Sequence, residues 1–96
     1  MHKKIQQVQL PVLFFKEGKQ IIAYTPALDL STFGKTLAQA QKRFAEVVEI
    51  FFEELIRMGT LEEVLEECGW EKHNKEFLPP TVIAQGLTSV SVPFSR

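Results

Sequence analysis

The chain of 96 residues has few of the residues that build metal sites or disulfides. It contains one cysteine, Cys68, and two histidines, His2 and His73. A single cysteine cannot form a disulfide within the chain, and three scattered side chains do not make a zinc site. We therefore expect no metal or other cofactor, and the lone thiol favours a cytoplasmic protein.

Long apolar runs and glycine clusters are also missing from the sequence. The aliphatic and aromatic run at residues 12–15 is far shorter than the ~20 residues that a membrane helix needs. The five glycines are isolated, which excludes a glycine-rich phosphate loop. We expect neither a membrane segment nor an export signal.

Charge is nearly balanced over the whole chain but is distributed unevenly. Eleven basic and twelve acidic residues leave a net charge of −1, so no global positive field favours direct DNA binding. Residues 37–69 hold three basic and eight acidic residues, a net charge of −5. This acidic layer is either a solvated helix face or an attraction for a basic partner.

The pattern of apolar residues predicts a two-layer α+β sandwich with a mostly antiparallel sheet, one long helix and one short helix, forming a single domain over residues 1–96. Strands are expected at residues 8–15 and 20–25, as a hairpin, and at 27–33. Thr36 with Gln39, and Thr60 with Glu63, have the spacing of capping boxes that begin two helices, and Gly59 is expected to end the first. Residues 71–76, between Trp70 and Phe77, fit a small hairpin or a loop, and Val90, Val92 and Phe94 alternate with Ser89, Ser91 and Pro93 as in a last strand.

The long helix has more apolar surface than one sheet contact requires. Beside its main stripe, a second stripe includes Val48, Phe52 and Ile56. This stripe, or the expected last strand as an exposed edge, is a candidate surface for self-association. The alternative is that both complete the core of the domain itself. The candidate residues are Val48, Phe52, Ile56, Val90, Val92 and Phe94.

Catalytic patterns are weak. Cys68 and His73 suggest a nucleophile and base, but Cys68 continues the apolar stripe of the short helix and no third group orients the pair. Adjacent glutamates on a helix point about 100° apart, which makes them poor acid and base pairs. We expect no enzymatic activity and no catalytic residues.

Two segments of the chain resemble the HicB-like antitoxin family. They are residues 22–28, Ile-Ala-Tyr-Thr-Pro-Ala-Leu, and residues 31–40, Ser-Thr-Phe-Gly-Lys-Thr-Leu-Ala-Gln-Ala. Gly69-Trp70, then Phe77-Leu78-Pro79-Pro80 and the Val-x-Val pattern, are similar to a short variant of that family. The chain departs from the usual family pattern in having Asp29-Leu30-Ser31 for Pro-Gly-Cys, and Lys35 where an acidic residue is common.

The resemblance implies a truncated ribonuclease H-like fold without that enzyme's metal-binding carboxylates, since only Asp29 lies near an expected strand end. It further implies the antitoxin of a type II toxin-antitoxin system, which neutralises a HicA-like toxin, a small basic ribonuclease, by stoichiometric binding. Longer relatives append a DNA-binding domain, and nothing after Phe94 is expected to encode one. A homodimer or higher homo-oligomer is expected. The alternatives are an orphan scaffold that binds another protein or a small ligand, and an enzyme that uses Cys68 and His73.

Overall fold

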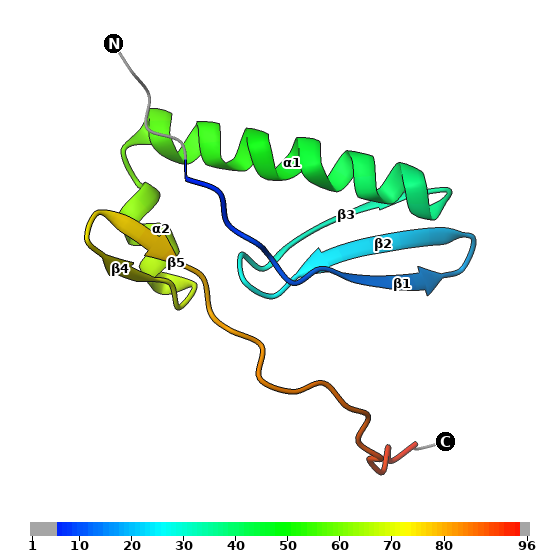
Figure 1. Ribbon diagram of the computed structural model, residues 1–96. Helices are drawn as coiled ribbons and strands as arrows, with labels where there is room; N and C mark the ends of the chain where they lie inside the picture. The colour runs from blue at the N-terminus through cyan, green and yellow to red at the C-terminus, as the bar shows by residue number, and fades with distance from the viewer. Residues whose placement is uncertain (1–5, 95–96) are drawn as a thin grey trace.

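The computed structural model describes residues 6–94 and has the expected α+β class (Figure 1). Three strands form an antiparallel sheet in the order β1-β2-β3, and a second, two-stranded sheet pairs β4 with β5. The long helix α1 lies across one face of the larger sheet, and the short helix α2 follows it. The elements are β1 Leu13–Glu17, β2 Gln20–Thr25, β3 Leu30–Gly34, α1 Leu37–Met58, α2 Leu61–Glu67, β4 Glu71–His73 and β5 Glu76–Leu78.

Both ends of α1 are where the sequence indicates them. The Thr36 hydroxyl accepts a hydrogen bond from the Gln39 N–H at 3.1 Å. The Gln39 side chain does not return to Thr36 but accepts from the Lys35 N–H at 2.6 Å, one residue earlier. Gly59 ends the helix with φ at 72°, a left-handed conformation that favours glycine. Thr60 begins α2 without a side-chain cap, so the second capping box is wrong.

The helix and the sheet meet most closely at Gly34. A Cβ atom at Gly34 would lie 2.6 Å from the backbone nitrogen of Ala40, closer than real Cβ contacts. Only a residue without a side chain lets the first turn of α1 approach β3 in this way. Ala23, Ala40 and Phe44 form the core beside this contact.

A second core joins α2 to the loop between β2 and β3. Trp70, 4% exposed, packs with Ala27, Leu28 and Leu65. The Trp70 indole N–H donates to the carbonyl of Ala27 at 2.8 Å, so its polar atom is satisfied inside this core. This bond links residues 43 positions apart in the chain.

The stretch after Trp70 is a hairpin rather than a loop. Asn74 and Lys75 have φ of 49° and 69°, and two positive values are typical of a two-residue type I′ turn. The side-chain amide of Gln6 forms two hydrogen bonds with the backbone of Phe77, at 2.6 and 3.0 Å. Residues 6–12 are thereby tied to β5, and Val8 and Leu10 pack on the second core.

Three expected strands differ from the structure. The first strand begins at Leu13, not at residue 8, because Val8 and Leu10 pack on the second core instead. The third begins at Leu30, not at residue 27, because residues 26–29 form a turn in which Asp29 has a φ of 49°. The last strand, with Val90, Val92 and Phe94, is wrong: residues 79–94 contain no helix or strand and extend away from the sheet (Figure 1). Alternation alone does not make a strand, since a strand also needs a hydrogen-bonding neighbour.

We predict that Gly34→Ala destabilises the fold by about 2 kcal/mol, because α1 must move away from β3 to admit the methyl group. The matched control is Gly86→Ala, where a Cβ atom meets nothing within 4 Å. We expect that control to change stability by less than about 0.5 kcal/mol. Urea unfolding followed by circular dichroism measures both, and equal stability of the two variants would contradict the close helix–sheet contact.

Candidate protein-interaction surface

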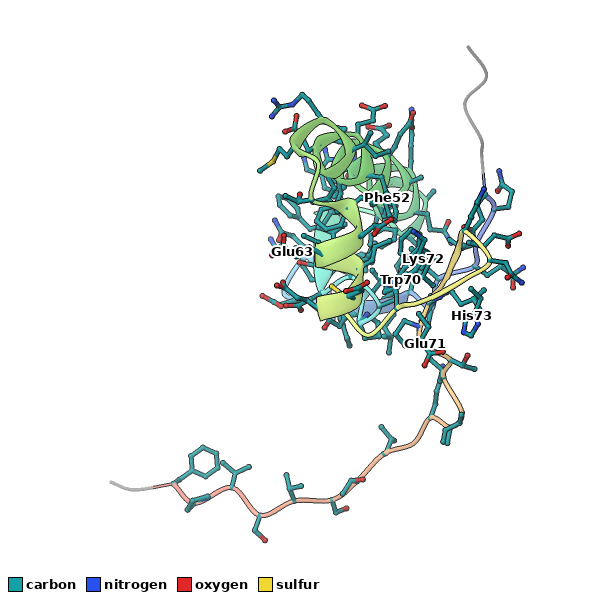
Figure 2. The ribbon with its side chains drawn as sticks, turned by 90° about the vertical axis from the view of Figure 1, so that its left-hand side faces the viewer. Phe52, Glu63, Trp70, Glu71, Lys72 and His73 are labelled. Carbon is teal, nitrogen blue, oxygen red and sulfur yellow. The ribbon has the colours of Figure 1, made fainter. Side chains whose placement is uncertain are left out.

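The second stripe of α1 is divided between the core and the surface. Val48 and Phe52 are half-buried and pack against the buried core residues. The Phe52 ring meets Trp70 edge to face, with ring centroids 6.3 Å apart, and both labelled rings lie on the same side of the molecule in Figure 2. Ile56, in contrast, is 63% exposed. Of the three residues, Ile56 alone offers most of its side chain to a partner.

The sheet face opposite α1 is apolar and open. Cross-strand neighbours share a face, and Ile21, Ala23 and Gly34 face the helix. The alternate positions therefore point the other way. Leu13, Phe15 and Phe33 on that face are 39%, 48% and 49% exposed. We call the set the open sheet face: Leu13, Phe15, Ile22, Tyr24, Ser31 and Phe33.

Polar groups border the open sheet face. The Tyr24 hydroxyl donates to Asp29 at 3.0 Å, and this hydrogen bond, with desolvation and the nearby negative charge, raises the pKa of Tyr24. Arg43 reaches from α1 to the carbonyl of Phe33 at 3.1 Å, with its guanidinium 5.8 Å from the ring centre. An apolar centre with charged and hydroxyl groups at its border is typical of a protein-binding surface.

The outer edge of the sheet is also free in the part of the chain that the structure describes. Strand β1 pairs with β2 alone, and α1 packs mainly on β3 and β2. Phe14, on the helix-facing side of β1, is consequently 39% exposed. Strand β1 therefore presents unpaired backbone groups and apolar side chains together.

The segment 79–94, called here the extended segment, is the most exposed part of the described chain. Val90, Val92 and Phe94 are 75%, 61% and 90% exposed, and Ile83 and Leu87 are almost fully exposed. Figure 2 shows this segment leading away from the body of the protein. The structure therefore does not bring these three candidate residues together with Phe52 or Ile56.

The geometry gives little support to the hypothesis of an enzyme that uses Cys68 and His73. Cys68 is half-buried, and desolvation, with the negative charges of Glu67 and Asp29, raises the pKa of its thiol. His73 is exposed on β4, where its Nε2 lies 3.1 Å from a carboxylate oxygen of Glu71. A raised thiol pKa leaves less of the nucleophilic thiolate near neutral pH.

Within residues 6–94, no group of three or more histidine, cysteine or acidic side chains is placed to hold a metal ion. No helix in this part of the chain is long and apolar enough to cross a membrane. A groove of about 480 Å³ runs between residues 9–11 and 78–82, and its lining has no charged side chain.

Comparison of the chain with family models, with curated proteins and with solved structures gives no match. The resemblance to HicB-like antitoxins therefore stays a prediction from the sequence.

The open sheet face was not among the candidate surfaces inferred from the sequence. One signal for it was available in the sequence. Leu13 and Phe15 make the second side of β1 apolar like the first, whereas a strand covered on one side would alternate apolar and polar residues. The sequence does not show which side of the sheet α1 covers. It also does not show that no other described element covers the second side, because both depend on tertiary packing.

We predict that Phe52→Glu destabilises the protein by at least about 2 kcal/mol, because a carboxylate would replace a ring packed on Trp70. Ile56→Glu, four residues later on the same helix, should change stability by less than about 0.5 kcal/mol, since Ile56 is already in water. Thermal unfolding by circular dichroism distinguishes them. If the Phe52→Glu variant is as stable as the original chain, Phe52 is not needed for the core and is again a candidate for the interaction surface.

We predict that Cys68 reacts slowly with iodoacetamide in the folded protein, and that its alkylation rate begins to rise at a higher pH than in the unfolded chain. The reason is the raised pKa of the thiol, which lowers the thiolate fraction at any pH below it. Rates measured against pH, with and without urea, test this on the same single thiol. Faster alkylation of the folded protein at neutral pH would favour a reactive cysteine.

Proposed function

We propose that this protein is a non-catalytic, HicB-like antitoxin that binds and masks a small basic ribonuclease, the HicA-like toxin of a type II system. The observation that supports binding without catalysis is the open sheet face, an exposed apolar surface bordered by hydrogen-bonding groups. The candidate nucleophile and base, Cys68 and His73, lie elsewhere, directly after α2 and on β4. The toxin itself comes from the family resemblance, and a cytoplasmic location is part of the same proposal.

The helical layer has the charge that a basic partner requires. Residues 37–69 hold five more acidic than basic residues, and Glu46, Glu49 and Glu53 are all exposed on α1. Opposite charge on the two proteins accelerates their association and discriminates against acidic partners. Charge thus supplies attraction, and the apolar surface supplies the contact area that excludes water.

An orphan scaffold that binds another protein or a small ligand is the second candidate. The groove beside Pro11 and Pro80 favours it, because an uncharged groove of about 480 Å³ is within the size range of small-ligand sites. Its lining lacks the convergent charged groups that fix a polar ligand, so an apolar ligand is the one this groove fits.

We predict that tagged protein, recovered from its native cells after nuclease treatment, brings down a small basic protein in near-equal amount. Mass spectrometry identifies the partner, and an RNA cleavage assay tests the partner once it is separated. Cleavage by the free partner, and its loss on adding this protein back, is the expected result. Recovery of this protein without a stoichiometric partner would favour the orphan scaffold.

Charge-reversal variants make that experiment specific. Glu49→Lys with Glu53→Lys should reduce the recovered partner at least several-fold, because both remove attraction from α1. Glu71→Lys with Glu76→Lys is the matched control, since it makes the same change of net charge at exposed positions of the small hairpin. Equal loss in both variants would show that net charge, and not the face of α1, determines binding.

A further inference from the structure

We propose that the extended segment of one copy adds as a strand to the free edge of β1 in a second copy, and that two copies exchange these segments reciprocally. This interaction requires only this chain, so it is tested without the proposed toxin. It assigns a partner to two exposed features, the unpaired edge of β1 and the apolar residues of the segment.

The composition of the extended segment is unlike that of a solvated linker. Residues 77–94 contain no charged side chain, although 24% of the whole chain is charged. Segments that remain in water are usually charged and poor in apolar residues. This one exposes Val82, Ile83, Leu87, Val90, Val92 and Phe94. Such a segment gains free energy when a surface covers it.

The end of the segment has the pattern of a strand. Val90, Val92 and Phe94 fall on one side of an extended backbone, and Ser89 and Ser91 fall on the other. A strand with this alternation covers apolar surface with one face and tolerates solvent on the other. What the segment lacks within its own copy is a hydrogen-bonding neighbour.

The edge of β1 provides such a neighbour. In the described chain it pairs on one side only, with β2. Leu13, Phe14 and Phe15 occupy both of its faces and are 39%, 39% and 48% exposed. A strand placed beside β1 would satisfy the free backbone groups and cover apolar side chains on whichever face it packs. An edge this apolar is the type that pairs with another chain unless something blocks it.

The direction of the segment favours a second copy over the copy that it belongs to. Pro79 and Pro80 restrict the backbone to extended conformations, and Pro80 lines the same groove as residues 9–11. From there the chain leads away from the sheet in both views (Figures 1 and 2). Fully extended, residues 83–94 span about 40 Å, enough to reach a neighbouring copy.

Reciprocal exchange gives a closed assembly. If each of two copies donates its segment and accepts the other, both edges and both segments are used, and a two-fold dimer results. A chain of one-way additions would instead leave an unpaired edge and an unpaired segment at its ends. We therefore expect a discrete dimer with twice the 11.0 kDa mass of the chain.

The test is site-specific cross-linking of the purified full chain. A benzophenone amino acid replaces Phe94, which is 90% exposed, and light then joins it to whatever lies beside it. The expected product has twice the mass of the chain on a denaturing gel. After trypsin digestion, the cross-linked peptide should join residues 76–96 to residues 5–16, which include most of β1.

Other products would overturn the proposal, each in a different way. A cross-link to residues 5–16 that keeps the mass of one chain means that the segment folds back on its own copy. A double-mass product that joins residues 76–96 to themselves means that two segments pair with each other. A chain that stays monomeric by light scattering and gives no cross-link means that the segment has no partner within this protein.

A pair of full-chain variants tests the alternation independently. Val90→Asp with Val92→Asp should convert the dimer to a monomer and raise the dissociation constant at least 100-fold, because two charges would enter the covered face. Ser89→Asp with Ser91→Asp puts the same charges on the other face and should leave most of the dimer. All four positions are exposed in one copy, so folding should be unaffected. Equal dissociation of both variants would contradict a strand with one covered face.

Discussion

The close approach of α1 to β3 determines which surfaces of this protein are covered. Gly34 lets the backbone of Ala40 come nearer than any side chain would allow, and this contact sets the first turn of the helix against one edge of the sheet. The 22-residue helix then lies over β3 and β2. One helix cannot cover both faces of a sheet or its full width, so the face opposite α1 and the outer strand β1 remain exposed.

The position of the second core depends on where α1 ends. Because α1 ends at Gly59, the chain turns and α2 brings Leu65 and Trp70 against the loop that follows β2. The bond from the Trp70 indole to the Ala27 carbonyl links this loop to the chain after α2. Val48 packs on both cores and joins them, and Phe52 contacts Trp70, which explains why an apparently spare stripe of α1 is half used within the protein.

Much of the fold was predictable because it is encoded locally. The cap at Thr36, the end at Gly59 and the hairpin of β1 and β2 follow from short-range rules that the structure confirms. The last strand was wrong for the opposite reason, since the alternation at Val90 and Val92 says how a strand would face but not what it would pair with. The candidate stripe was likewise divided, with Ile56 exposed and Phe52 packed, because burial depends on Trp70, distant in sequence. The open sheet face needed the same tertiary information.

The open sheet face and the extended segment lie apart from most of the acidic residues, and this separation affects how binding is organised. Eight of the twelve acidic residues lie within residues 37–69, the helical layer, whereas the open sheet face lies on the opposite side of the sheet and the extended segment lies beyond the body. A long-range charge attraction acts on a partner before contact, and its strength falls with added salt. Pairing of an uncharged strand has no such dependence on salt. Self-association through the segment and attraction of a basic protein to α1 therefore differ in their dependence on salt, and measurements at several salt concentrations separate the two interactions.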